Sequence, residues 1–322
     1  MIDAYAAKGK PFNLGMVFPA STHNYELRYW LAAGGINPGL YSADDVSGKI
    51  GGDVLISVTP PPQMPATLET GTIDGCWVGE PWKQAAVAKG IGVPVITDND
   101  IWKNDPEKVF GLTAEFVQTN PQTTLAQTKA LIRVAIWLNA NDTVNRAKAV
   151  EISSRPDYVG ADAAVLANSI TGSFEYEKSD VWPTPDFNVF FRYNATFRYY
   201  SDAVRYLAQI RRWGQTAEFK PDAWCDEAAT SVYKPDVQMA AAVALIAEGK
   251  ATAEMFDFDA NGYRAPTADF IDGVAHDGTR PNACIDSLTV GLKSTQTVMD
   301  GAKLPETREL PRVTLRHALP SA

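Results

Sequence analysis

The fold is decided by residues 18–35, which read Phe18-Pro-Ala-Ser-Thr-His-Asn-Tyr-Glu-Leu-Arg-Tyr-Trp-Leu-Ala-Ala-Gly-Gly35. The residues just before them, 12–18, form a short apolar segment that predicts a β-strand. Residues 25–33 then predict a helix, which the glycine pair at 34–35 ends. The chain therefore begins with a strand that leads through a polar loop into a helix.

That polar loop predicts a binding site for an anion. Ser21, Thr22 or Asn24 can cap the helix, whose first backbone N–H groups have no partner within the helix. These N–H groups and the positive end of the helix dipole point into the loop, where His23 can add a further donor. A single loop of this kind is a weak signal, so its surroundings decide its meaning.

The composition indicates an ordinary globular protein large enough for two domains. The chain has 322 residues, of which 45% are hydrophobic and 21% are charged. Its formal net charge of −9 argues against nucleic acid as a partner. An anionic ligand must therefore be held by local dipoles and one or two cations.

Cysteine and histidine are too sparse for a metal site. They occur at Cys76, Cys225, Cys284, His23, His276 and His317. Their spacings fit no zinc motif, and nothing requires a disulfide. We expect no metal and no cofactor. No apolar run has the length of a membrane span, and residues 1–10 carry no export signal or lipobox cysteine.

Short strands and short helices alternate in the first third of the chain. Strands are expected at 53–58, 73–78 and 93–97, and helices at 63–70 and 82–88. This alternation predicts βαβ crossovers, a mainly parallel sheet and an α/β fold. Ligands of such sheets bind at the carboxyl ends of the strands. The loops expected there are 19–24, 59–63, 79–82 and 97–102.

Helices dominate after a further strand expected at 109–113. They are expected at 124–139, 145–151, 161–170, 202–213, 222–229 and 237–248. An aromatic-rich extended segment covers residues 188–200, and the chain from about 279 is rich in Thr, Arg and Pro. We therefore divide the chain into an α/β lobe with the anion-site loops (1–110), a mainly helical part (111–278) and an irregular tail (279–322).

Several long motifs identify a family. They are Arg28-Tyr-Trp-Leu-Ala-Ala-Gly-Gly-Ile-Asn37, Asp53-Val-Leu-Ile-Ser-Val-Thr-Pro-Pro-Pro-Gln63, Val78-Gly-Glu-Pro-Trp82, Ile101-Trp-Lys-Asn-Asp-Pro-Glu-Lys-Val-Phe-Gly111 and Pro185-Asp-Phe-Asn-Val-Phe-Phe-Arg192. Over residues 11–255 the chain resembles the nitrate-binding proteins of bacterial nitrate ABC importers, and less closely their bicarbonate-binding siblings.

The resemblance implies a periplasmic-binding-protein type II architecture, in which two α/β lobes hold the anion between them. Residues 13–108 resemble lobe two, and residues from 112 resemble the return to lobe one with its helical cover. Family members begin with residues that have no counterpart here, so we expect the first lobe to be incomplete and the chain to be truncated.

The resemblance also implies a ligand set. His23 stands where the family places a histidine that contacts nitrate, and Thr22 precedes it. Lys89 stands where nitrate binders carry a lysine, which would supply a full charge to a monovalent anion. The structural alternatives are a helix-capping histidine and a solvated lysine in the last turn of a helix.

Two further residues complete the expected ligand set. Gln63 is the nearest donor after a run of three prolines, and Glu80 lies in the Gly-Glu-Pro-Trp motif. A carboxylate beside an anion is unfavourable. We therefore expect Glu80 to accept hydrogen bonds from neighbouring donors and to fix the loop rather than to contact the ligand.

These expectations define a function. The chain would be the substrate-binding component of an ABC importer that binds nitrate, and nitrite as well, and delivers it to a membrane permease. The family works at the periplasmic face of the inner membrane. The alternatives are a cytoplasmic nitrate/nitrite sensor of the same family and a bicarbonate-binding sibling. We do not expect an enzyme, because the sequence has no nucleophile-elbow, Walker or dinucleotide-binding motif.

Overall fold

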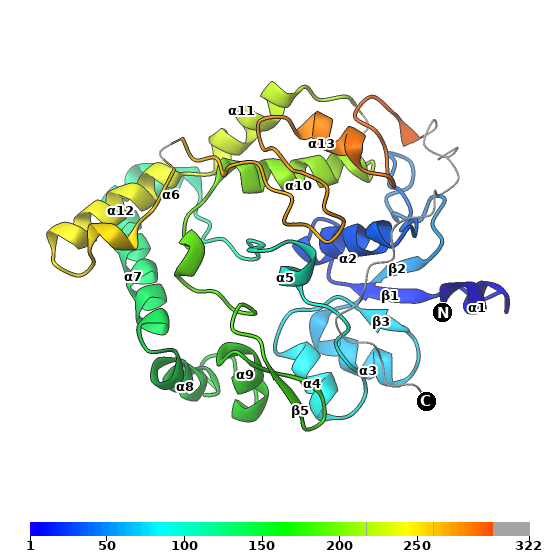
Figure 1. The fold of residues 1–322 in the computed structure, drawn as a ribbon, viewed down its shortest axis with the longest axis horizontal. Coiled ribbons are helices and arrows are strands. Elements are labelled where there is room, and N and C mark those ends of the chain that lie inside the picture. Colours follow the sequence, from blue (N-terminus) through cyan, green and yellow to red (C-terminus); the bar gives the residue numbers. More distant parts are fainter. Residues whose placement is uncertain (217, 260, 299–322) are drawn as a thin grey trace.

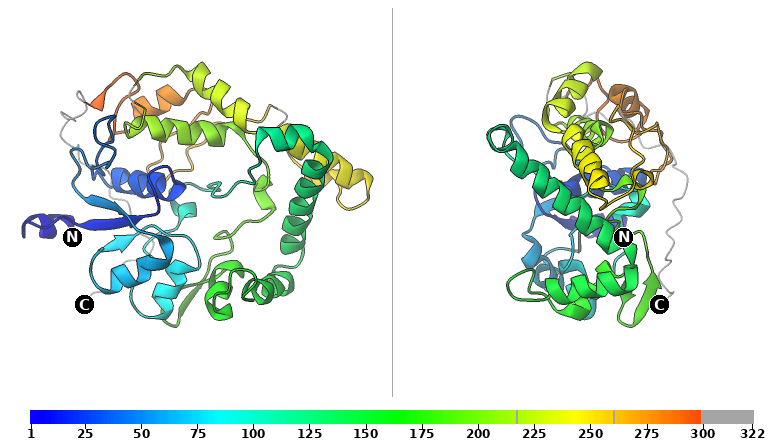
Figure 2. Two further views of the ribbon diagram at one scale, coloured as in Figure 1. Left: turned by 180° about the vertical axis from the view of Figure 1, so that it is seen from behind. Right: turned by 90° about the vertical axis from the view of Figure 1, so that its left-hand side faces the viewer.

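The computed structural model describes residues 1–216, 218–259 and 261–298. Its elements lie around a ring (Figure 1), with the parallel sheet and α2 (Thr22–Ala33) on one side and α7 (Pro121–Ala140) on the other. Further helices and a hairpin close the ring at both ends. The turned views in Figure 2 show that the ring is narrow when it is seen from the side.

A three-stranded parallel sheet forms the core of the α/β lobe. Its order is β2 (Leu55–Val58), β1 (Asn13–Met16) and β3 (Gly75–Cys76), with Asn13 opposite Leu55 and Leu14 opposite Gly75. Leu14, Met16 and Ile56 pack with Leu27 and Leu31 of α2 in one buried cluster. The predicted strand–loop–helix unit and the parallel sheet are confirmed. A short helix, α1 (Ile2–Ala6), precedes the sheet.

The helices of this lobe form close to their predicted bounds because their end signals are local. Ser21 caps α2, and its side chain accepts a hydrogen bond from the backbone N–H of Asn24. A 3₁₀ turn, η1 (Pro61–Gln63), leads into α3 (Met64–Glu69). The next two helices are α4 (Trp82–Ala88) and α5 (Asp98–Ile101).

Two predicted strands do not form. Residues 93–97 and 109–113 have no strand assignment, and Val93, Val95 and Val109 are exposed. The valines give both segments the composition of strands, but a strand also needs a neighbour that completes its hydrogen bonds. The parallel sheet described here ends at β2 and β3.

The remaining helices carry the chain around the ring. They are α6 (Ala114–Thr119), α7, α8 (Asp142–Ser153), α9 (Ala163–Ile170), α10 (Tyr200–Arg212), α11 (Asp222–Val232) and α12 (Pro235–Ala247). All the helices expected after residue 113 are present, and α6 adds a short one. An antiparallel hairpin, β4 (Ser173–Glu177) with β5 (Asp180–Pro183), was not predicted. The expected extended segment at 188–200 instead contains a 3₁₀ turn, η2 (Arg192–Asn194), and a further 3₁₀ turn, η3 (Ala253–Met255), follows α12.

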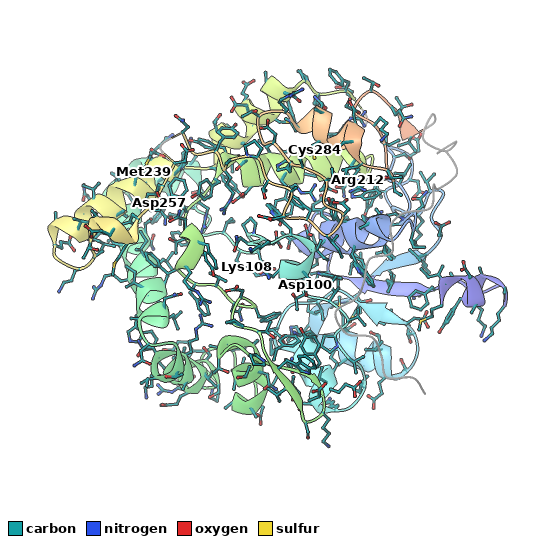
Figure 3. All side chains as sticks on the ribbon, viewed as in Figure 1. Asp100, Lys108, Arg212, Met239, Asp257 and Cys284 are labelled. Carbon is teal, nitrogen blue, oxygen red and sulfur yellow. The ribbon has the colours of Figure 1, made fainter. Side chains whose placement is uncertain are left out.

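The irregular tail predicted from residue 279 contains a helix at residues 281–287, whereas residues 288–297 have no helix or strand. Helix α13 (Pro281–Ser287) packs against α10, and Figure 3 shows Arg212 and Cys284 on these two helices. Arg212 Nε donates to the carbonyl of Val290 at 2.8 Å, and Leu292 lies in the same buried cluster as Trp213. Residues 299–322 of the predicted tail lie outside the described residues.

Within the described ranges, none of the helices combines the length and apolar character that crossing a bilayer requires.

Candidate functional site

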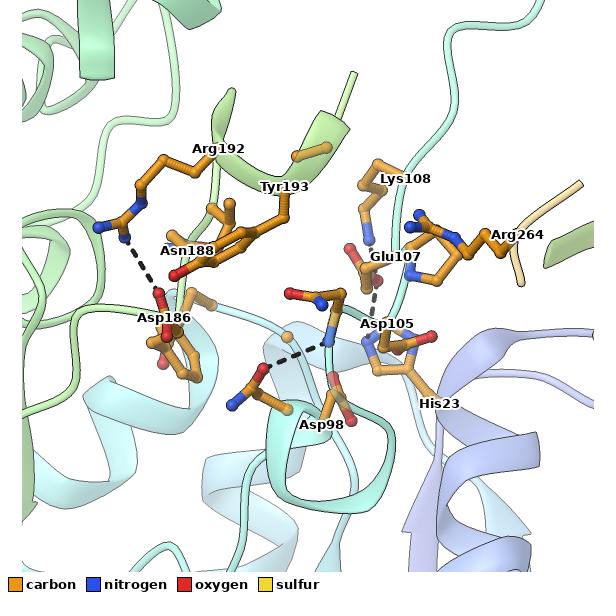
Figure 4. Close-up of a pocket in the computed structure, with 18 residues that line it drawn as sticks. His23, Asp98, Asp105, Glu107, Lys108, Asp186, Asn188, Arg192, Tyr193 and Arg264 are labelled. Carbon is orange, nitrogen blue, oxygen red and sulfur yellow. Dashed lines mark hydrogen bonds and ion pairs between the residues drawn. The ribbon is translucent and has the colours of Figure 1, made fainter. Parts of the chain in front are cut away.

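A cavity of about 420 Å³ opens at the middle of the ring (Figure 4). Its walls come from the start of α2, the loop before α4, the segment from α5 to residue 108, the segment 186–195, and Arg264. Three of the four loops expected at the sheet edge therefore contribute to it. The fourth, residues 59–63, does not line it, and Gln63 is exposed.

His23 lies in the first turn of α2 and faces the cavity. Its Nε2 atom is 3.7 Å from Oε1 of Glu107. Burial lowers the pKa of His23, while the charge of Glu107 opposes this shift. Gly79 forms the adjacent wall, where an added Cβ would lie 3.3 Å from Nε2 of His23. A glycine at position 79 therefore leaves the imidazole open to a ligand.

Lys108 is the lysine of the cavity, and Lys89 is not. The side chain of Lys108 is 78% exposed and forms an ion pair with Glu107. Lys89 is exposed at the C-cap of α4 and does not line the cavity. Lys108 reaches the cavity because the segment after α5 turns back across the sheet edge, a path held by tertiary contacts such as the hydrogen bond from Lys103 N–H to Asp269 O. The signal for Lys108 lay in the Pro-Glu-Lys part of the motif at 101–111.

Among the other expected ligands, Glu80 lines the cavity and Thr22 does not. Thr22 is half-buried beside His23. Glu80 Oε2 accepts a hydrogen bond from the backbone N–H of Gln84 at 3.1 Å, and Oε1 is 2.5 Å from Nζ of Lys83. These contacts agree with the expected role of Glu80 in fixing the loop.

Four more carboxylates line the cavity, and each has a partner. Glu107 is paired with Lys108, and Asp186 with Arg192 at 3.1 Å. The indole N–H of Trp77 donates to Asp98 at 2.9 Å, and the hydroxyl of Tyr206 donates to Asp105 at 2.7 Å.

Burial weakens the ionisation of two of these groups. It raises the pKa of Asp98 to about 6, and the charge of Glu107 adds to the shift. Burial also raises the pKa of Asp105 well above its usual range, and Glu26 and Asp98 raise it further. The acidic wall therefore carries less negative charge than its composition indicates.

Four basic side chains face these acids: His23, Lys108, Arg192 and Arg264. The guanidinium of Arg264 is paired with Asp202 at 2.9 Å and lies 4.0 Å from the ring centroid of Tyr199. Arg192 and Arg264 are thus neutralised by aspartates. His23 and Lys108, which share Glu107, are the groups best placed to exchange a carboxylate for an anionic ligand.

In the described part of the chain, no group of three or more His, Cys, Asp or Glu side chains could hold a metal ion.

Comparison with known proteins shows what the chain is similar to. Residues 1–154 match the NMT1-like family. The nitrate/nitrite binding protein NrtA of a Nostoc species is 31% identical over 292 residues, which are 90% of this chain and 60% of that protein. The nitrate import ATP-binding protein NrtC of a Synechocystis species is 36% identical over 202 residues, which are 62% of this chain and 28% of that protein.

The fold agrees with the sequence comparison. The crystal structure of the periplasmic nitrate-binding protein NrtA from Synechocystis matches with a TM-score of 0.76 and 27% identity, covering 89% of this chain and 69% of that one. The chain spans about 60% of the length of the NrtA relative from Nostoc. Over nine-tenths of its length, the chain is therefore similar in both sequence and fold to solute-binding proteins that are named as nitrate-binding.

Proposed function

We propose that this chain binds nitrate, and nitrite as well, in the cavity at the middle of the ring, as the substrate-binding component of an ABC importer. The observation that carries the proposal is the meeting of His23 at the N-terminus of α2, the open wall at Gly79 and the Glu107–Lys108 pair in one cavity. The names of its relatives support the same ligand.

The anion would be held without covalent chemistry. The first turn of α2 offers backbone N–H groups and the positive end of its dipole. His23, kept neutral by its lowered pKa, donates one hydrogen bond. Lys108 supplies the full charge: its exposed side chain can leave Glu107 for the ligand at little cost, because exposed ion pairs contribute about 1 kcal/mol or less.

The partners follow from the proposed role. A relative named as a nitrate import ATP-binding protein supports an ABC importer as the setting, with its membrane permease as the receiver of the ligand. The periplasmic face of the inner membrane is the corresponding location. The two lobes would be residues 1–110 and 111–278, as expected from the sequence, and the protein would bind its ligand without converting it.

Calorimetric titration of the purified chain with nitrate, nitrite and bicarbonate tests this function. We expect saturable binding of nitrate and nitrite and weaker binding of bicarbonate. Lys108→Glu should abolish nitrate binding because it reverses the charge of the lysine that lines the cavity, whereas Lys89→Glu, which changes charge equally on an exposed helix end, should leave it unchanged. Loss of binding in Lys89→Glu but not in Lys108→Glu would refute the assignment, and a folded wild type that binds none of the anions would refute the function.

A further inference from the structure

Lys83 lies directly behind the wall of the cavity. It stands in the first turn of α4, and its side chain is 19% exposed. Nζ is 2.5 Å from Oε1 of Glu80. It also lies 3.4 Å from the ring centroid of Phe174 and 4.2 Å from that of Phe187. Glu80 and Phe187 line the cavity, so Lys83 touches two parts of its wall from behind.

This placement matters because Glu80, like His23, belongs to the part of the cavity wall that the α/β lobe forms. Its second oxygen accepts only a neutral backbone N–H, that of Gln84. The ammonium group of Lys83 is therefore the full charge that balances Glu80. Without it, Glu80 would place an uncompensated negative charge on the cavity and repel an anion.

The surroundings of Lys83 make its charge effective. Burial lowers the pKa of Lys83 to about 8, and the charges of Glu80 and Asp98 oppose this shift. The ammonium group lies against the rings of Phe174 and Phe187, whose centroids are 4.7 Å apart, and these rings shield it from water. A charge in such a setting acts more strongly on its neighbours than an exposed charge does.

Among the described residues, the elements that pack against α4 supply no other carboxylate that competes with Glu80 for Lys83. They are α3, α9 and β4. Helix α9 has no charged side chain, and the one on α3, Glu69, is exposed. On β4, Glu177 is exposed, while Glu175 is bound to the amide of Asn168 and to the backbone N–H of Ser179.

We propose that Lys83 is a positioning residue for anion binding: it neutralises Glu80 from behind the cavity wall and thereby allows a wall with a carboxylate to accept an anion. The inference rests on the proposed function. It assigns Lys83 a role separate from that of Lys108, which lies inside the cavity and would contact the ligand.

A double-variant cycle tests this role. Nitrate would be titrated into wild type, Lys83→Met, Glu80→Gln and the double variant at pH 7, with thermal unfolding of each. We expect Lys83→Met to bind about tenfold more weakly, since it leaves a unit charge near the ligand. The double variant should recover to within about threefold of wild type, and Glu80→Gln alone should bind more tightly than wild type. Lys129→Met, which breaks an ion pair with Glu248 between α7 and α12, is the matched control.

Rescue by the second substitution separates charge balance from a structural role. If Lys83 acts by balancing the charge of Glu80, removing that charge in the double variant should restore nitrate binding. A structural role for Lys83 would leave the double variant as weak as Lys83→Met.

The outcomes distinguish the two proposals. If wild type binds nitrate but Lys83→Met binds equally well, or the double variant stays as weak as Lys83→Met, the role of Lys83 is wrong and the function stands. If Lys83→Met does not fold, Glu80→Gln decides: weaker binding than wild type overturns the role. A folded wild type that binds no nitrate overturns both.

Discussion

Replacing Arg28 with methionine should test how this lobe is held together. Arg28 is fully buried in α2. Its Nε donates to Oδ1 of Asn24 at 2.8 Å, Nη1 to the carbonyl of Gly39 at 2.7 Å and Nη2 to the carbonyl of Gly48 at 3.0 Å. Its guanidinium also lies 4.5 Å from the ring centroid of Tyr41. One side chain thus ties the loop of residues 34–54, the excursion between α2 and β2, to the helix.

Gly48 shows how closely this excursion surrounds the guanidinium. It has a φ of +71°, and an added Cβ would lie 2.5 Å from Nη2 of Arg28. The backbone can approach Arg28 only because position 48 carries no side chain. Methionine would fill much of the same volume but could not donate a hydrogen bond.

The magnitude follows from the acceptors that lose their donor. Arg28 makes five hydrogen bonds, and the acceptors of the three shortest, all buried, lose this donor in the variant. Each acceptor left unpaired costs about 1–3 kcal/mol. Removing the desolvated charge of Arg28 returns part of this, since burial already lowers its pKa. We therefore expect the free energy of unfolding to fall by about 3 kcal/mol.

Urea unfolding at pH 7, followed by tryptophan fluorescence, measures this change. Arg133→Met removes an exposed arginine from α7 and should change the unfolding free energy by less than about 0.5 kcal/mol. A fall of less than about 1 kcal/mol in Arg28→Met, with an unchanged m-value, would show that the excursion does not depend on these three bonds.

Two further predictions concern the cavity wall. Asp98 has a pKa raised to about 6, so its ionised form opposes folding, and its contribution to stability should rise as the pH falls from 7 towards 4. Asp98→Asn can still accept the hydrogen bond from Trp77. In chemical unfolding, its free energy of unfolding should exceed that of wild type by about 1–3 kcal/mol at pH 8 and should equal it at pH 4. An equal effect at both pH values would mean that ionisation is not the cause. Gly79→Ala should weaken nitrate binding about tenfold in calorimetry at unchanged melting temperature, because its Cβ would lie 3.3 Å from Nε2 of His23; unchanged affinity would place the ligand elsewhere.

The strand–loop–helix unit was predictable because its signals are local. The cap at Ser21 and the glycine pair after Ala33 bound α2 within the sequence itself. Helix α4 forms at its predicted bounds, Trp82–Ala88, for the same reason. The position of His23 at a helix N-terminus therefore followed from the sequence, and so did the cavity wall that it forms.

Pairing and long-range contact were decided by the tertiary structure. Residues 109–113 have strand-forming side chains but no strand beside them, whereas β4 and β5 pair as a hairpin in which Phe174 is fully buried. A segment's own residues cannot specify whether a neighbour is present to accept its hydrogen bonds.

The lysine that lines the cavity is a second example of a feature that long-range contacts decide. Lys89 and Lys108 are both lysines near the ends of predicted elements, and the sequence alone favoured Lys89. The structure brings Lys108 to His23 because the chain after α5 turns back over the carboxyl edge of the sheet. The sequence determined the helix whose N-terminus lines the cavity, since caps and periodicity act over a few residues. The tertiary structure decided which charges meet there, because that depends on contacts between segments far apart in the chain.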